Sequence, residues 1–221
     1  MSEGFSAQAA RILLDTKSVL FNAQTPFVFT SGRVSPVYVD CRRLISFPAE
    51  RGRLMDMGAE LIRETCDPLD YVAGGETAGI PYAAFLAERL NLPMLYVRKK
   101  PKGFGRMAQI EGCMDETGKK VLLVEDLQTD GGSKKLFIDA LRQVDAVVEH
   151  SFVVFHYGIF AASEENNRAM GVELHALATW WDVLEAAKKG NDFDPQTLEA
   201  VEAFLHAPEG WAPAKIAQSE A

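Results

Sequence analysis

Cysteine is scarce in this sequence, and its spacing is irregular. The 221 residues include three cysteines, Cys41, Cys66 and Cys113, and none of them forms a C-x-x-C pair. An odd number of widely separated cysteines argues against a disulfide framework and against a zinc site built on paired cysteines. The four histidines also lack the short spacing of metal ligands in a single motif. We therefore expect reduced thiols, no metal site formed by protein ligands, and a cytoplasmic protein.

Long apolar runs and an excess of positive charge are also missing. No run is long enough to span a membrane, and the N-terminus lacks the basic-then-apolar pattern of a signal peptide. Lysine and arginine together number 23 against 31 aspartates and glutamates, which gives a net charge of −8. This balance argues against nucleic acid as the main partner. An anionic substrate would have to be bound by local positive charge.

The sequence does contain the pattern of a buried strand that ends in a polar, glycine-rich loop. The run 120–124, apolar from Val121 onward, is typical of a buried parallel strand, and Glu125 and Asp126 follow it before the Thr/Gly/Ser loop 129–133. Glycines and the N-terminus of the next helix, predicted at 135–144, present N–H groups to an anion. The two carboxylates can accept hydrogen bonds from sugar hydroxyls. The pattern favours a site for ribose beside phosphate, and an ordinary strand–turn–helix junction is the alternative.

A second unit of the same kind precedes it. Residues 70–73 form a predicted strand, Gly74 to Gly79 a glycine-containing loop, 80–90 a helix and 94–97 the next strand. Successive strand–helix units predict an α/β fold with a parallel sheet and right-handed crossovers. The remaining predicted elements are helices at 5–21, 48–66, 180–189 and 195–206, a hairpin at 26–40, and strands at 147–155 and 172–177.

The segment 98–106 concentrates positive charge in an otherwise acidic chain. Five of its nine residues are basic and two are glycine. Such a segment repels itself when it is empty, so it is most simply interpreted as a lid that closes over an anion. A solvated basic loop is the alternative. The glycines of this segment also match G-x-G-x-x-A, but no strand directly precedes them, so we do not interpret them as a dinucleotide site.

Four segments together resemble the type I phosphoribosyltransferases. The stretch from Glu125 to Ser133 is similar to the motif with which that family binds phosphoribosyl pyrophosphate (PRPP). The segments 31–38, 74–81 and 98–112 resemble orotate phosphoribosyltransferases in particular, and they follow one another in the family's order. Each segment alone is moderately specific, whereas four in register are strong evidence of relationship.

The resemblance implies the type I phosphoribosyltransferase fold, a central, mostly parallel sheet flanked by helices, with a small hood. We expect a single domain over 1–221, with an N-terminal helix and hood hairpin in 1–45, the α/β core in 46–180, and C-terminal helices and a tail in 181–221. The implied reaction converts orotate and PRPP into orotidine 5′-phosphate and pyrophosphate, a step of pyrimidine synthesis. The family also implies Mg²⁺ carried by PRPP, and a homodimer in which lid residues reach the neighbouring site.

Residue roles follow from the resemblance position by position. The implied PRPP contacts are Thr77, Ala78, Glu125, Asp126, Leu127, Gln128, Thr129, Asp130, Gly131, Gly132 and Ser133. The residues that would neutralise the departing pyrophosphate are Arg98, Lys99 and Lys102. The implied orotate contacts are Ser31, Tyr38, Thr129 and His156.

Several positions depart from the family pattern. Phe104 stands where the lid usually has histidine, and His156 where an arginine for the orotate carboxylate is common. Asp130 brings a negative charge into the phosphate loop, which would repel phosphate unless the side chain points away. The alternatives are therefore the same chemistry on another base, or a PRPP-sensing regulator without turnover. The lid lysines favour an enzyme, because a sensor has no leaving group to stabilise.

Overall fold

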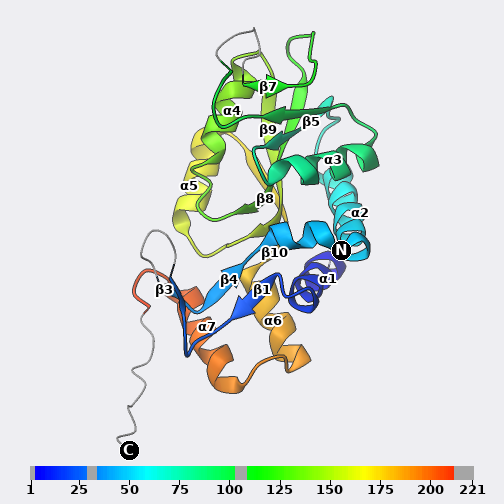
Figure 1. The fold of residues 1–221 in the computed structure, drawn as a ribbon. Helices are drawn as coiled ribbons and strands as arrows, with labels where there is room; N and C mark the ends of the chain where they lie inside the picture. Colours follow the sequence, from blue (N-terminus) through cyan, green and yellow to red (C-terminus); the bar gives the residue numbers. More distant parts are fainter. Residues whose placement is uncertain (1–2, 29–33, 103–108, 212–221) are drawn as a thin grey trace, which may run out of the picture.

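The computed structural model describes residues 3–28, 34–102 and 109–211 (Figure 1). Its helices are α1 (Glu3–Asp15), the 3₁₀ helix η1 (Cys41–Ser46), α2 (Pro48–Thr65), α3 (Gly79–Leu90), α4 (Lys134–Arg142), α5 (Ala161–Met170), α6 (Trp180–Gly190) and α7 (Pro195–His206). Its strands are β1 (Val19–Phe21), β2 (Phe27–Val28), β3 (Val34–Ser35), β4 (Val37–Val39), β5 (Tyr71–Gly75), β6 (Met94–Val97), β7 (Ile110–Glu111), β8 (Lys120–Gln128), β9 (Val147–His156) and β10 (Glu173–Thr179).

A six-stranded sheet organises the molecule. Its strand order is β10-β9-β8-β5-β6-β7, and every pairing is parallel except that of β7 with β6. Helices α3, α4 and α5 connect β5 to β6, β8 to β9 and β9 to β10, as expected for parallel neighbours. The predicted α/β class with a mostly parallel sheet is therefore confirmed. The two strands that carry the glycine-rich loops, β5 and β8, are direct neighbours.

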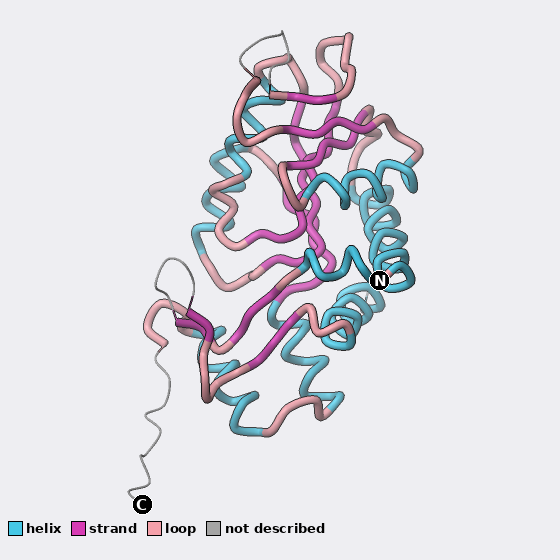
Figure 2. Tube along the Cα trace, viewed as in Figure 1, coloured by secondary structure: helices cyan, strands magenta, loops and turns pink. Residues whose placement is uncertain are grey.

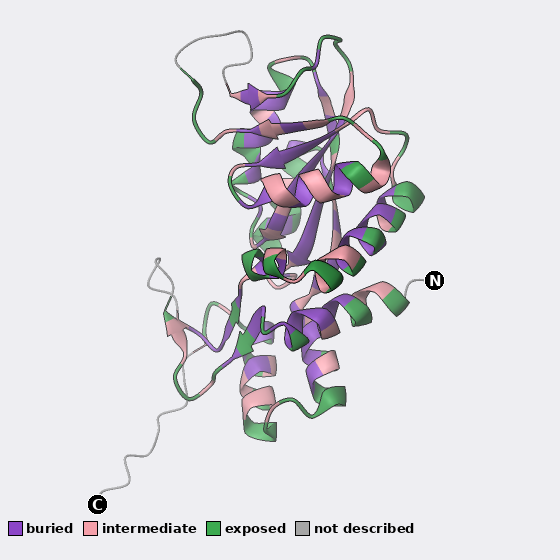
Figure 3. Ribbon diagram, turned by 45° about the vertical axis from the view of Figure 1, so that its right-hand side comes forward, coloured by how far each residue is buried: buried purple, intermediate pink, exposed green. Residues whose placement is uncertain are grey.

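Apolar side chains on both faces of this sheet are buried, so helices cover it on both sides (Figure 3). Leu122 and Val124 of β8 belong to a core shared with α1, α2, α3 and α6. Val121 and Leu123 point the other way, into a second core with α4. This alternation follows from the period of two along a strand. Two covered faces fix the direction of β8 and hence the position of the loop at its end.

The N-terminal region differs from its prediction. The helix predicted at 5–21 ends at Asp15, and Val19–Phe21 is instead strand β1, which pairs antiparallel with β4. Lys17 has a φ of +54°, a left-handed conformation that ends the helix. The buried hydroxyls of Thr16 and Ser18 lie 2.8 Å apart in the same turn. In the sequence, the helical spacing of apolar residues continues beyond this turn, so the spacing alone did not predict where the helix ends.

The predicted hairpin is formed by β2 and β3, which pair antiparallel (Figure 2). Residues 29–33, which lie between the two strands in the sequence, are outside the described residues. Tyr38 belongs to β4 and faces Leu20 of β1 across the second small sheet. These two small sheets stand beside the main sheet, and the three-part division at residues 45 and 180 stays a prediction.

Two further differences concern the main sheet. Strand β8 runs through Gln128, because β9 continues to pair with it as far as Gln128 and His156. Glu125 and Asp126 are therefore strand residues rather than the start of a loop. Helix α5 was not predicted at all. Among the helices of the described residues, none combines the length and apolar character needed to cross a membrane.

Candidate functional site

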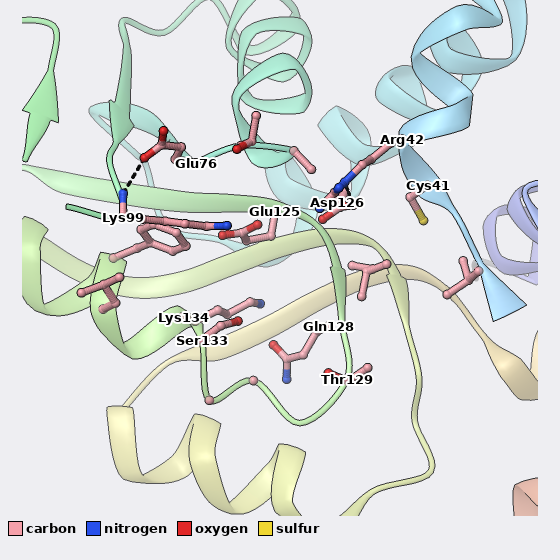
Figure 4. Close-up of a pocket in the computed structure, with 18 of the residues that line it drawn as sticks. Cys41, Arg42, Glu76, Lys99, Glu125, Asp126, Gln128, Thr129, Ser133 and Lys134 are labelled. Atoms are coloured by element: carbon pink, nitrogen blue, oxygen red, sulfur yellow. Dashed lines mark hydrogen bonds and ion pairs between the residues drawn. The ribbon is translucent and has the colours of Figure 1, made fainter. Parts of the chain in front are cut away.

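A cleft of about 750 Å³ opens at the carboxyl ends of β5 and β8, beside the small β1–β4 sheet (Figure 4). Ligand sites of parallel sheets lie at this edge, because the loops that follow adjacent strands meet there. The residues that line the cleft are Tyr38, Val39, Asp40, Cys41, Arg42, Glu76, Thr77, Ala78, Lys99, Glu125, Asp126, Leu127, Gln128, Thr129, Gly131, Gly132, Ser133, Lys134, Leu136 and Phe137.

The loop 129–133 forms one wall. Gly131 has a φ of +79°, which only glycine adopts without strain, and it turns the chain toward α4. The carboxylate of Asp130 accepts a hydrogen bond from the Gly132 N–H at 3.0 Å, and its backbone carbonyl accepts one from Asn166 at 2.8 Å. Asp130 does not line the cleft. The Asp130 carboxylate therefore stabilises the conformation of the loop, while Thr129 and Ser133 line the cavity.

Glu125 and Asp126 form the floor at the end of β8. Burial, reinforced by the neighbouring charge of Asp126, raises the pKa of Glu125 to about 7. Burial also raises the pKa of Asp126, against the pull of Arg42, whose Nε lies 3.9 Å from its Oδ2. A Cβ at Gly75 would lie 1.9 Å from Oε1 of Glu125, so the glycine at the end of β5 makes room for this carboxylate.

The opposite wall comes from the second glycine-rich loop and the start of the basic segment. Thr77 and Ala78 line the cleft, and the peptide bond between Glu76 and Thr77 is cis. Oε2 of Glu76 accepts a hydrogen bond from the Lys99 N–H at 2.7 Å, which joins the two segments (Figure 4). The Lys99 side chain lines the cavity, so one cation of the basic segment already faces the carboxylates.

Comparison with known proteins assigns the family. Residues 53–179 match the model of the phosphoribosyl transferase domain. The orotate phosphoribosyltransferase of Dinoroseobacter shibae is 56% identical over 204 residues, which cover 91% of this chain and 90% of that protein. That of Rhizobium rhizogenes is 53% identical over 205 residues, which cover 92% of this chain and 88% of that protein. The chain belongs to the orotate phosphoribosyltransferases.

Solved structures agree with this assignment. The orotate phosphoribosyltransferase from Aeropyrum pernix matches with a TM-score of 0.69 and 32% identity, over 84% of this chain and 99% of that one. The UMP synthase of Leishmania donovani matches with a TM-score of 0.77 and 28% identity, over 91% of this chain and 42% of that longer one. The predicted family and the type I phosphoribosyltransferase fold are confirmed.

Two predicted lid residues lie away from the cleft. Arg98 and Lys102 both contact Glu111 on β7, at 3.4 Å and 2.5 Å. The hydrogen bond from Lys102 is the largest cause of the lowered pKa of Glu111, and the charge of Arg98 lowers this pKa further. Neither cation lines the cavity of its own chain. Residues 103–108, which include Phe104, lie outside the described residues.

The residues expected to contact orotate are only partly brought together. Thr129 and Tyr38 line the cleft, and Ser31 falls outside the described residues. His156 lines a separate pocket near Trp181, with its Nε2 2.8 Å from Oγ of Ser163. Burial lowers the pKa of His156, which disfavours a cationic substitute for arginine at this position. An orotate contact by His156 stays a prediction that its position in this structure does not support.

Lys134 is a cleft residue to which the sequence analysis gave no role. Its side chain is 2% exposed, and its Nζ donates a hydrogen bond to Oγ of Ser151 at 3.1 Å. Burial lowers the pKa of Lys134 to about 7, while the charge of Glu125 acts in the opposite direction. Its place in the first turn of α4, four and seven residues before Ile138 and Leu141, could have predicted this inward position.

Proposed function

We propose that this chain transfers the phosphoribosyl group of PRPP to orotate and releases pyrophosphate. The reaction forms orotidine 5′-phosphate, a step of pyrimidine synthesis. The observation that carries the proposal is the cleft itself. A glycine-rich anion loop, two carboxylates and a lysine converge there from the ends of two adjacent parallel strands, in a chain that belongs to the orotate phosphoribosyltransferases.

We propose a position for PRPP in which its anionic groups and its hydroxyls each lie near residues of complementary charge or hydrogen-bonding character. The 5-phosphate would sit in the loop 129–133, where Thr129 and Ser133 line the cavity with hydroxyls and the N-terminus of α4 favours an anion. The ribose hydroxyls would donate hydrogen bonds to Glu125 and Asp126. The pyrophosphate would then lie near Thr77, Ala78 and Lys99, the cleft residues of the opposite wall.

In the reaction, the bond between C1 of the ribose and the pyrophosphate oxygen breaks while a ring nitrogen of orotate bonds to C1, and the proton of that ring N–H is released to pyrophosphate or solvent. Positive charge develops at C1 and negative charge on the leaving pyrophosphate. Catalysis is therefore mainly positioning and charge stabilisation, for which Lys99, Arg98 and Lys102 are suited. No side-chain nucleophile is needed.

We propose that Mg²⁺ enters with PRPP. The cleft fits a hard divalent cation, because carboxylates from three different segments, Asp40, Glu76 and the Glu125–Asp126 pair, line it with oxygen donors. When bound, the ion supplies positive charge to the pyrophosphate oxygens. The remaining steps depend on the residues of the cleft.

We also propose a cytoplasmic homodimer in which each lid serves the neighbouring site. The contacts of Arg98 and Lys102 with Glu111, away from their own cleft, support action on a second subunit. The reduced thiols expected from the sequence support a cytoplasmic location.

The deciding experiment measures orotate consumption, by its ultraviolet absorbance, with PRPP and with or without Mg²⁺. Uracil and purine bases serve as parallel acceptors. We expect magnesium-dependent loss of orotate alone. Turnover of another base would change the acceptor, and PRPP binding without any turnover would favour a sensing role.

A further inference from the structure

A cluster of three side chains able to bind a metal lies far along the sheet from the cleft. It consists of Cys66, His150 and His175, whose ligand atoms all lie within 4.8 Å of one another. His150 is near the start of β9 and His175 near the start of β10, whereas the cleft is built at the carboxyl ends of the strands. None of the three lines the cleft. The proposed reaction therefore leaves this cluster without a role.

Parallel register explains how the cluster forms. His150 pairs with Glu173, so these two side chains share one face of the sheet. His175 follows Glu173 by two residues and lies on the same face. Helix α2 packs on this face of β9 and β10, and it ends at Thr65, so Cys66 completes the group. Because the ligands come from three elements that are far apart in the sequence, no short sequence motif predicts the cluster.

The distances suit one ion. Nε2 of His175 lies 3.0 Å from Nδ1 of His150 and 3.4 Å from Sγ of Cys66. A tetrahedral zinc with bonds of about 2.0–2.1 Å to nitrogen and about 2.3 Å to sulfur separates its ligand atoms by roughly 3.3–3.6 Å. Small side-chain shifts would therefore admit the ion. Oε2 of Glu173 lies 3.8 Å from Nδ1 of His150 and can supply the fourth ligand.

The hydrogen bonds around His175 orient it as a ligand. Oγ1 of Thr65 donates its proton to the carbonyl of Leu61 at 2.7 Å. The same oxygen lies 3.1 Å from Nδ1 of His175. Because its own proton is already donated, it can only accept a hydrogen bond from the Nδ1–H group. The neutral ring then carries its lone pair on Nε2, which is directed at Cys66 and His150. Metal-binding histidines are typically held in this way by a partner on the other ring nitrogen.

Composition and access indicate the kind of ion. One thiolate, two imidazoles and a carboxylate form a borderline-soft set that suits Zn²⁺ and disfavours Mg²⁺ or Ca²⁺. His175 is buried, but the Glu173 side chain is 66% exposed. An ion can therefore enter from solvent beside the glutamate.

We propose that Cys66, His150, His175 and Glu173 bind a divalent transition-metal ion, Zn²⁺ in preference to others, in a structural site separate from the catalytic cleft. The ion would link the end of α2 to β9 and β10. The proposal departs from the sequence-based expectation that no protein ligands form a metal site. It does not depend on the proposed reaction.

The test uses the full chain, freed of metal by a chelator and kept reduced. Zn²⁺ is titrated against a chromophoric chelator, and Co²⁺ is used as a spectroscopic substitute. We expect one ion per chain, and with Co²⁺ a near-ultraviolet thiolate charge-transfer band. Cys66→Ser should abolish the band and weaken Zn²⁺ binding by at least about tenfold. Cys113→Ser, which changes an exposed cysteine, should retain both.

Glu173→Gln provides a second variant, because a change at this exposed residue leaves Cys66, His150 and His175 in place. It should weaken Zn²⁺ binding while circular dichroism stays that of the wild type. Orotate turnover should be unchanged in both variants. Absence of Zn²⁺ binding in the wild type, or a cobalt band that survives in Cys66→Ser, would overturn the proposal. Zinc bound equally by all variants would place the ion elsewhere, for example in the carboxylate-lined cleft, and would overturn it too.

Discussion

Glu125 is a partly buried carboxylate and Lys134 a buried amine in the same cleft, and each affects the protonation of the other. Burial raises the pKa of Glu125 and lowers that of Lys134, so both charged forms are costly there. The positive charge of Lys134 is the largest influence that lowers the pKa of Glu125. We infer that Lys134 increases the ionised share of Glu125 near neutral pH, and the ionised form is the one that accepts hydrogen bonds from ribose hydroxyls.

Lys134→Met tests this coupling. Without the amine, the pKa of Glu125 should rise further, and a larger share of the carboxyl will be protonated at pH 7. The acidic limb of the pH profile of kcat/KM for PRPP should therefore move to higher pH. Lys135→Met is the matched control, since Lys135 is exposed and pairs with Asp139. An acidic limb at the same pH in wild type and Lys134→Met would contradict the coupling.

Lys102→Ala tests the lid at a single charge. The pyrophosphate gains negative charge as the bond to C1 breaks, so a cation that meets it acts mainly in the transition state. We expect kcat to fall by about a hundredfold, with a much smaller change in PRPP affinity measured by equilibrium binding. Lys100→Ala removes an equal charge two residues away and should have little effect. Equal losses in kcat and affinity would argue against the role given to Lys102.

At the scale of elements, the cleft depends on how closely α3 approaches β8. Gly79 is the first residue of α3, and a Cβ there would lie 2.3 Å from the carbonyl oxygen of Val124. That oxygen belongs to a central strand paired on both sides, so it cannot move aside. The absence of a side chain at Gly79 sets the spacing between the two loops that form the cleft.

Gly79→Ala should therefore destabilise the protein, by about 1–3 kcal/mol through overpacking. It should also raise KM for PRPP, because the Thr77–Ala78 wall shifts with the helix. Urea unfolding measures the first effect and steady-state kinetics the second. Gly52→Ala is the control: its Cβ would meet only Arg89, at 3.7 Å, and helix propensity favours alanine. Equal stability of wild type and Gly79→Ala would refute the packing argument.

Local patterns were enough to predict the two strand–loop–helix units, because the signals for a buried strand and a glycine-rich turn both come from residues adjacent in the sequence. They failed where a distant partner decides the structure. Strand β8 continues through Gln128 because β9 pairs with it, and Val19–Phe21 became a strand because β4 lies beside it. Helix α5 buries only Ser163 and Met170, too little for an apolar period. The cleft position of Lys134 and the cluster around His175 likewise depend on contacts between separate elements.

For the whole molecule, the net charge of −8 opposes the binding of a polyanion such as PRPP, so cations must gather locally. Arg42, Lys99 and Lys134 do so in the cleft. Arg98 and Lys102 instead contact Glu111 at the sheet edge. A dimer in which these cations serve the neighbouring cleft would place the full positive charge around the pyrophosphate of each site.

Mixing two inactive variants tests this arrangement. Lys102→Ala removes a lid cation and Asp126→Asn a cleft carboxylate, and each alone should have very low activity. If the lid acts on the neighbouring subunit, each mixed dimer contains one site with both residues intact. Random exchange makes about half of the dimers mixed, so activity should recover to about a quarter of the wild-type value. If the lid acts within its own chain, every site of a mixed dimer carries one defect and no activity returns.

A control separates this recovery from a general effect of mixing. The double variant Lys102→Ala/Asp126→Asn, mixed with Lys102→Ala, leaves every site without its lid cation, so no recovery should follow. Subunit exchange itself can be followed by affinity-tagging one variant and measuring its co-purified partner. Recovery with the single variants but not with the double variant would establish that each cleft is completed by the neighbouring subunit. Only that geometry puts both substitutions in one site of the mixed dimer and leaves the other site intact.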